Sequence, residues 1–115
     1  MLNDKKHDAI FKALGDARRR KILDLLKAGP ATTGTLCGAL APLNRCTVMQ
    51  HLGVLEKAEL IIVKRRGRHR WNYFNPLPIR EIHDRWISQY ARGAVDLLAA
   101  VKDAIEDDDE ASPPS

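Results

Sequence analysis

The spacing of apolar residues predicts two helices at the start of the chain. Apolar residues recur at helical spacing over residues 22–26, after Asp16, whose carboxylate is typical of a helix N-cap. Gly29, followed by proline, predicts the end of this helix. A shorter apolar patch over residues 10–14 precedes it and ends at Gly15. The two helices are therefore expected to meet at residues 15–16.

A second pair of helices follows, joined by a tight turn. Thr32 or Thr33 can cap a short helix through residue 40, since a hydroxyl accepts a hydrogen bond from a first-turn amide. Asn44 is the next natural N-cap, and apolar residues then fall at spacings of four and three, at Val48, Leu52 and Leu55. Gly53 lies inside this helix, where a glycine costs about 1 kcal/mol relative to alanine. The pattern predicts helix, turn, helix.

The next segment predicts a β-hairpin. Residues 60–65 and 70–74 are rich in β-branched and aromatic side chains, and they flank the sequence RGRH at residues 66–69. Gly67 can adopt the positive φ that such a turn requires. The pattern predicts a two-stranded hairpin with a cationic tip, ended by Pro76 and Pro78.

From Ile79 to Ile105 the apolar residues keep helical spacing. One continuous helix over this segment would be roughly 40 Å long at about 1.5 Å per residue. So long an apolar stripe exceeds what the rest of the chain can cover, and an uncovered apolar patch marks an interaction surface. A second copy of the chain is the expected cover, through a face that contains Ile82, Trp86, Ile87, Tyr90 and Leu97.

Length and composition narrow the class of protein. The 115 residues, 44% hydrophobic and 30% charged, suit one helix-rich domain and argue against a multidomain enzyme. The longest apolar runs are far shorter than the roughly 20 residues of a membrane span. The N-terminus is charged at once and has no signal core, so the expected location is the cytoplasm. There the two cysteines are expected to be small, buried thiols.

The net charge of +4 hides a strong asymmetry along the chain. Residues 1–102 carry nineteen basic and nine acidic side chains, which leaves +10, whereas residues 103–115 carry only acids. A basic body indicates a polyanionic partner such as nucleic acid. We therefore expect a functional domain over residues 1–102 and an acidic, disordered tail over residues 103–115, for which the simplest role is solubility.

Two groups of polar residues fit the chemistry of DNA recognition. The hairpin concentrates five cations that can bind phosphates, Lys64, Arg65, Arg66, Arg68 and Arg70. The helix after Asn44 is expected to present four polar side chains on its outer side, Arg45, Thr47, Gln50 and His51. Arginine pairs with guanine and glutamine with adenine in the major groove, so Arg45 and Gln50 are the candidates for base reading. Thr47 can contact a phosphate or a thymine methyl.

Three motifs together resemble the ArsR (arsenic-repressor) family of bacterial transcriptional regulators over roughly residues 7–90. They are the opening LGDARRRKILDLL, the segment VMQHLGVLEKAEL and the hairpin KRRGRHRWNY. The resemblance implies a mainly α winged helix-turn-helix with a two-stranded β-wing and a long C-terminal dimerisation helix. It also implies a homodimer that binds an imperfect palindrome in double-stranded DNA, with recognition helices in major grooves and wings beside minor grooves.

Two residues of the segment VMQHLGVLEKAEL leave the resemblance incomplete. His51 corresponds to the histidine of the family's HL segment, so it can contact a phosphate, but a hydrogen-bonded structural histidine is an equal alternative. Met49 stands where similar proteins often have serine. Its thioether cannot donate to a phosphate, so it either touches a thymine methyl or the helix is rotated slightly.

The metal sites that the family implies are incomplete in this chain. Cys37 matches one of two sensing cysteines, but Ala39 stands at the second position. Glu81 and His83 match the start of the family's zinc pattern, whose later positions are Ala94 and Leu97 here. We therefore expect no metal and no cofactor, and the effector is not identified by the sequence. A redox role for Cys46 at a helix start is the alternative to a packed residue.

The sequence has neither a glycine-rich phosphate loop nor a catalytic serine, histidine and aspartate arrangement, so an enzyme is not expected. The best-supported function is a homodimeric DNA-binding transcriptional repressor that blocks a promoter by occupancy. The alternative is a winged-helix module that binds another protein and has no specific DNA site.

Overall fold

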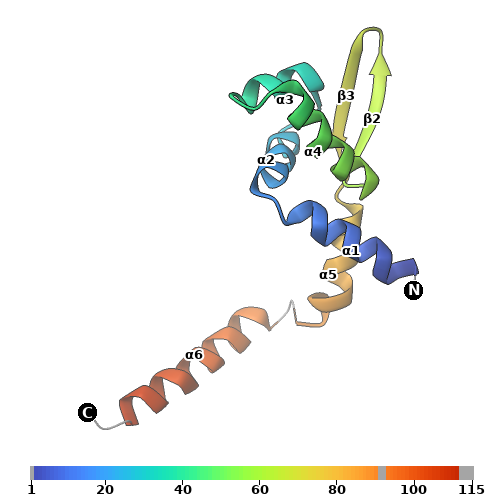
Figure 1. Ribbon diagram of the computed structural model, residues 1–115. Coiled ribbons are helices and arrows are strands. Elements are labelled where there is room, and N and C mark those ends of the chain that lie inside the picture. Colours follow the sequence, from blue (N-terminus) through green and yellow to red (C-terminus); the bar gives the residue numbers. More distant parts are fainter. Residues whose placement is uncertain (1, 91–92, 112–115) are drawn as a thin grey trace. The chain divides into compact units, whose positions relative to one another are not determined.

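The computed structural model describes residues 2–90 and 93–111 and divides into two compact units, Met1–Glu81 and Ile82–Ser115. Both units are drawn in Figure 1. In chain order the elements are α1 (Leu2–Leu14), α2 (Ala17–Lys27), β1 (Ala31–Thr32), α3 (Thr33–Ala39), α4 (Arg45–Lys57), β2 (Ile61–Arg66), β3 (His69–Phe74), α5 (Leu77–Trp86), the short 3-10 helix η1 (Ser88–Tyr90) and α6 (Ala94–Ala111). The chain is mainly helical, as predicted.

The helix starts predicted from capping residues are confirmed. Asp16 Oδ1 accepts a hydrogen bond from the backbone amide of Arg18 at 2.8 Å and begins α2. The side chain of Thr32, rather than that of Thr33, caps α3. Asn44 Oδ1 accepts from the amide of Thr47 at 2.8 Å and begins α4. Each cap satisfies an amide that has no partner inside its helix.

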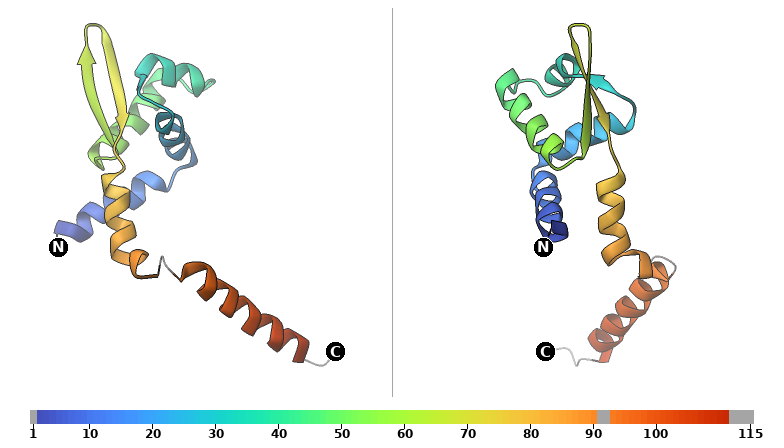
Figure 2. Two further views of the ribbon diagram at one scale, coloured as in Figure 1. Left: turned by 180° about the vertical axis from the view of Figure 1, so that it is seen from behind. Right: turned by 90° about the vertical axis from the view of Figure 1, so that its right-hand side faces the viewer.

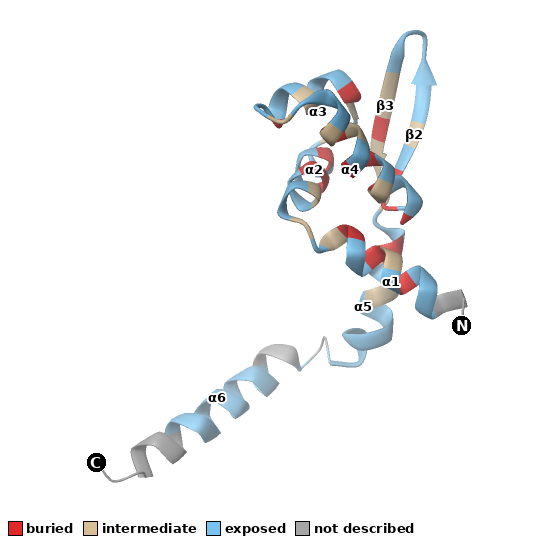
Figure 3. Ribbon diagram, viewed as in Figure 1, coloured by how far each residue is buried: buried red, intermediate tan, exposed pale blue. Residues whose placement is uncertain are grey.

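The first unit has a continuous apolar core. Helices α1 to α4 and strand β2 each bury apolar residues, and Figure 3 shows buried positions along α2 and α4. The largest fully buried apolar side chains are Ile10, Ile22, Leu36, Val48, Leu52, Leu55, Leu60 and Ile61. The helix-turn-helix pair α3 and α4 is thus fixed against the other helices by core packing.

The sheet has one strand more than the sequence predicted. Strands β2 and β3 form the expected antiparallel hairpin, with Arg66 opposite His69. Short β1 pairs with the other edge of β3, so that Ala31 lies opposite Asn72 and the order is β1-β3-β2. A two-residue strand leaves no alternating pattern for sequence analysis to detect. The hairpin projects from the helical part of the first unit as a narrow wing (Figure 2).

The predicted single C-terminal helix is wrong. The structure breaks it into α5, η1 and α6, although its apolar spacing continues across the breaks. At the first break the Ser88 hydroxyl donates to the Asp84 carbonyl at 2.8 Å, and the amide of Tyr90 bonds to Ile87, three residues back. Helix α6 restarts after Gly93, whose carbonyl accepts from Leu97. A serine that bonds back to its own helix and a glycine both weaken helix continuity.

The acidic segment also differs from its prediction. Helix α6 continues to Ala111, so residues 103–111 are helical where a disordered tail was expected. Residues 112–115 lie outside the described residues. Among the described residues, no helix combines the length and apolar character needed to cross a membrane.

Candidate nucleic-acid interface

Helix α4 presents two of the predicted base-reading residues. Val48, Leu52 and Leu55 are completely buried, so the opposite side of the helix faces outward. Arg45 and Gln50 are exposed, and Thr47 is half-buried beside the Asn44 cap. The buried stripe therefore fixes the helix and leaves an arginine and a glutamine in its first half accessible.

His51 was expected on the outer side of α4, but the structure places it on the buried side. It is only 7% exposed, because a position three residues after Val48 falls on the same buried face. An Arg19 guanidinium nitrogen lies 3.2 Å from its Nδ1. Since arginine can only donate, Nδ1 accepts and the proton resides on Nε2, which has no hydrogen-bond partner among the described residues. The structure therefore favours the structural role of this histidine.

The surroundings of His51 favour its neutral form. Burial lowers the pKa of His51 most strongly, and the nearby charges of Arg18 and Arg19 lower it further. The carboxylate of Asp16 acts in the opposite direction. The hydrogen bond from the Arg18 side chain holds the pKa of Asp16 well below its usual range, so this carboxylate stays charged.

The arginines at the start of α2 join helices rather than forming a free cationic face. Arg19 donates to the carbonyl of Ala13 at 2.8 Å and to the carbonyl of Lys12 at 2.8 Å, both in the last turn of α1. Arg20 donates to the carbonyl of Leu14. Carbonyls at a helix end lack partners within the helix, and these guanidinium groups supply them. Sequence analysis missed this role because the acceptors are backbone atoms.

The wing exposes most of its predicted cations. Lys64, Arg65, Arg66 and Arg68 are all exposed, on β2 and in the turn. Gly67 has a φ of 61° in this turn, in the left-handed region that glycine adopts without strain. The glycine therefore lets the hairpin reverse within two residues and holds the cations close together at its tip.

Arg70 differs from the other wing cations. Its guanidinium donates to Glu56 Oε2 at 3.0 Å, and its side chain is only 25% exposed. Glu56 lies on α4, so this ion pair connects the wing to the recognition helix. Arg70 therefore already has a charged partner within the chain, and its predicted contact with phosphate stays a prediction. Its sequence position gave no sign of the ion pair with Glu56, which spans fourteen residues.

Asn72 anchors the root of the wing and was not predicted from the sequence. It is completely buried, and its Nδ2 donates to the Ala31 carbonyl and to Thr33 Oγ1, each at 3.2 Å. These bonds attach β3 to β1 and to the start of α3. Buried polar groups cost free energy unless they are hydrogen-bonded, so the contacts fix the wing relative to the helix-turn-helix.

The first half of α4 and the wing tip meet around a cationic groove. Its volume is about 210 Å³. Helix α4 contributes Arg45 and Met49, and the wing contributes Arg65, Gly67, Arg68, His69 and Arg70. None of these lining residues is acidic. The structure thus brings Arg45, Arg65 and Arg68 together on one side of the first unit. Gln50 lines a different groove, between α1 and α4.

The candidate metal ligands are not assembled into a site. Among the residues that the structure describes, no three histidine, cysteine, aspartate or glutamate side chains are grouped to hold a metal ion. Cys37 is half-buried, and Cys46 is exposed, so the expectation of two buried thiols is wrong. Cys46 directly follows Arg45 in the first turn of α4, on a side that the core does not cover.

The comparisons with known proteins identify the family. Residues 16–63 match the model of the bacterial regulatory proteins of the arsR family. The HTH-type transcriptional regulator YuzN of Bacillus subtilis (strain 168), itself uncharacterized, is 41% identical over 86 residues, which are 70% of this chain and 94% of that protein. The chain belongs to the ArsR family. The resemblance deduced from the sequence motifs is confirmed.

Two further similarities agree with this family assignment. The transcriptional repressor SdpR of Bacillus subtilis (strain 168) is 32% identical over 88 residues, which are 76% of this chain and 97% of the repressor. A crystal structure of the ArsR family transcriptional regulator RHA00566 has a TM-score of 0.68 at 27% identity, and covers 77% of this chain and 90% of that one. The chain is therefore a DNA-binding transcriptional regulator with a winged helix-turn-helix. Its relatives are regulators, not enzymes.

Proposed function

We propose that this ArsR-family regulator is a homodimeric repressor that recognises an imperfect palindrome in double-stranded DNA. The groove between α4 and the wing is the observation that carries the proposal. It joins cations from the two elements that a winged helix-turn-helix uses for DNA, and no acid lines it. A surface of this charge attracts the phosphate backbone and places the first half of α4 against the base edges.

The two elements have different tasks in this proposal. Arg45 and Gln50 read bases from the exposed side of α4, with Thr47 at its edge. The exposed wing cations, Lys64, Arg65, Arg66 and Arg68, bind phosphates and set the orientation of the protein on the duplex. Arg70 contributes indirectly, because its ion pair with Glu56 holds the wing beside α4.

Apolar side chains after residue 81 support a dimer. Trp86, Ile87, Tyr90 and Leu97 are each between 43% and 52% exposed, and Ile82 is half-buried. Because the helix is broken, these residues do not share one helical face, but they lie within one segment. A second copy that covers this segment removes the exposed apolar surface from water. The resulting two-fold symmetry is what matches a palindromic DNA site.

Repression follows from occupancy of a promoter, which excludes polymerase sterically and requires no catalytic step. The relative SdpR is a transcriptional repressor, which supports this direction of regulation. A regulator that binds the bacterial chromosome acts in the cytoplasm. Beyond residue 102 the chain carries only acidic charges, which repel DNA and favour solubility over a direct role in binding.

The division of labour between α4 and the wing has a direct test. The full chain is used to select a preferred duplex from a random pool, and variants are then titrated on this duplex and on a scrambled one across a salt series. Gln50→Ala and Arg45→Ala should each cost about 1–3 kcal/mol on the selected duplex and little on the scrambled one. Arg68→Gln should weaken both alike and flatten the salt dependence by about 0.9 log units per lost phosphate contact.

Lys5→Gln is the matched control, because it removes an exposed charge on α1, outside both proposed DNA-contacting elements. Its effect should be smaller than that of Arg68→Gln on both duplexes. Equal losses on both duplexes for Gln50→Ala and Arg45→Ala would show that α4 does not read the sequence.

A further inference from the structure

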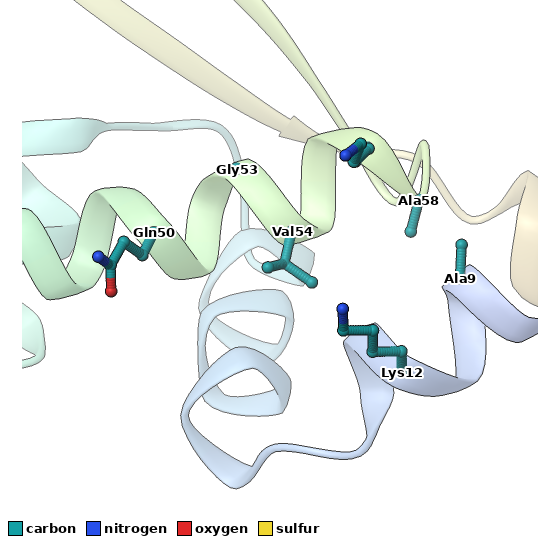
Figure 4. Close-up of a pocket in the computed structure, with 7 residues that line it drawn as sticks. Ala9, Lys12, Gln50, Gly53, Val54 and Ala58 are labelled. Atoms are coloured by element: carbon teal, nitrogen blue, oxygen red, sulfur yellow. The ribbon is translucent and has the colours of Figure 1, made fainter.

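A second groove, of about 510 Å³, lies between α1 and α4 in the first unit. This volume is typical of small-molecule sites, which span roughly 300–1,000 Å³ and are lined mainly by apolar groups with a few polar ones. Its lining follows that composition, as Figure 4 shows for most of the residues: Ala9, Lys12, Gln50, Gly53, Val54, Lys57 and Ala58. The proposed DNA contacts account only for Gln50.

Nothing in the described structure requires a glycine at position 53. It lies in the middle of α4, is exposed and has no positive φ. A Cβ added there meets no atom of the described structure within 4 Å. A glycine in an exposed helix interior destabilises the helix relative to alanine. What the glycine does provide is open space along α4, in a groove whose lining also includes the small side chains of Ala9 and Ala58 and the isopropyl group of Val54.

The groove is cationic as well as apolar. Lys12 comes from α1 and Lys57 from the last turn of α4, and no acidic residue is among the lining residues. Neither lysine forms an ion pair with any residue that the structure describes. In Figure 4 the Lys12 side chain extends from α1 toward Val54, across the groove. An occupant with a negative head and a hydrocarbon body satisfies both features of this lining.

We propose that the groove between α1 and α4 binds an amphipathic organic anion. Its carboxylate, or an equivalent head group, lies between the ammonium groups of Lys12 and Lys57, and its hydrocarbon body covers Val54 and the bare surface at Gly53. Opposite charge selects the anion over a cation of the same length, and apolar contact selects it over a small inorganic ion.

Calorimetric titration of the full chain without DNA tests the site, with octanoate as the probe and octylammonium as the comparison. These probes have the same chain length and opposite charge. Octanoate should bind at one site per chain, and octylammonium should bind at least tenfold more weakly. Equal binding of the two probes, or no binding of octanoate, would overturn the proposal.

Gly53→Leu tests the position, because a leucine fills the open space and leucine forms helices well. It should abolish octanoate binding. Gly38→Leu is the matched control, since Gly38 is an exposed helical glycine in α3 whose added Cβ also meets nothing within 4 Å. This control should bind octanoate like the wild type. Retained binding by a Gly53→Leu protein with a wild-type circular dichroism spectrum would refute the location.

Charge removal gives a second, milder test that leaves the groove open. Lys12→Gln and Lys57→Gln should each weaken octanoate binding about two- to fivefold, the range of one exposed ion pair. Lys21→Gln on α2, an exposed lysine outside this groove, should leave the affinity unchanged. In amide NMR spectra octanoate should shift the Gly53 and Ala58 signals. Shifts confined to the segment after residue 81 would place the anion elsewhere and contradict the assignment.

Occupancy of this groove should also oppose DNA binding, and this consequence rests on the proposed function. Gln50 lines the groove and is also a proposed base reader, so an occupant that contacts its amide competes with the base. Saturating octanoate should therefore weaken binding to the selected duplex more than to the scrambled one. An anion that binds but leaves both affinities unchanged would refute the coupling and retain the site. A protein that fails to select any duplex would refute the proposed function, while calorimetry still decides the site.

Discussion

The two units of this regulator use their apolar residues in opposite ways. In Met1–Glu81 five elements, α1 to α4 and β2, each bury large apolar side chains in one core within the chain. Between Ile82 and Glu106 none of the described side chains is buried. This segment nevertheless has apolar residues at helical spacing, such as Leu97, Val101 and Ile105 in α6, and they are exposed. Figure 3 shows the contrast between α4 and α6. The first unit has its own apolar core, whereas the second unit exposes its apolar side chains, as expected of a surface that a second chain covers.

The largest expected effect comes from opening the core of the first unit. Leu52 is completely buried, and Leu52→Ala should lower the free energy of unfolding by about 2–5 kcal/mol through lost burial and the remaining cavity. Denaturant titration measures this loss. Ile62→Ala is the control, since Ile62 on β2 is 49% exposed and should cost much less. Similar losses for the two variants would mean that the core is not where the structure places it.

A substitution in the second unit should have a smaller effect, on the dimer and therefore dependent on protein concentration. Leu97→Asp places a charge where the proposed dimer buries an apolar side chain, so the dimer should dissociate and the affinity for the selected duplex should fall. Sedimentation velocity at micromolar concentration measures the mass. Asp96→Asn, on the adjacent exposed position of α6, should leave the dimer intact. A monomeric wild type, or a Leu97→Asp dimer as tight as the wild type, would refute the dimer.

The smallest expected effect is on the pH dependence of the unfolding free energy, through the buried His51 of the first unit. Because burial lowers the pKa of His51 in the folded state, the unfolded chain binds its proton more tightly. The stability from neutral His51 is complete above its unfolded pKa, about 6.5, and is lost as the pH falls below that value toward the folded pKa. The unfolding free energy should therefore fall between pH 7.5 and pH 5.5 more steeply in the wild type than in His51→Gln. Parallel pH profiles would contradict this assignment.

Local interactions made much of the fold predictable. The caps at Asp16 and Asn44 bond to amides two or three residues away, so the residues that determine them are adjacent in the sequence. Gly67 marks the wing turn for a similar reason, because its positive φ is a property of one residue. Apolar periodicity also placed Arg45 and Gln50 on the exposed side of α4, and the β-branched and aromatic composition of residues 60–65 and 70–74 predicted the hairpin that exposes the cations.

Long-range contacts explain what the sequence did not reveal. The bond between Arg19 and His51 joins residues 32 apart, and the bonds of Asn72 reach back to residues 31 and 33. No periodic pattern encodes such partners. They bear on the predicted site, because His51 and Arg70 are each bonded to a side chain on another element.

The break after α5 shows what apolar periodicity does not predict. Apolar spacing continued through Ile87 and Tyr90, and this favoured one helix, but the backbone hydrogen bonds change at Ser88. Periodicity records which residues seek an apolar environment. It does not show whether one helix or several shorter elements present them, and the environment here is the partner surface that we propose.

Selection of duplexes from a random pool by the full chain tests directly whether the protein reads a palindromic DNA site as a dimer. A dimer that reads a palindrome should enrich duplexes with an inverted repeat, whose half-sites are separated by one helical turn of about 10–10.5 base pairs or a multiple of it. The repeat reports two copies of α4 related by two-fold symmetry, and its defined bases report sequence reading. Retention of duplexes without any enriched sequence, or enrichment of a single half-site, would contradict a dimeric repressor that reads a palindrome.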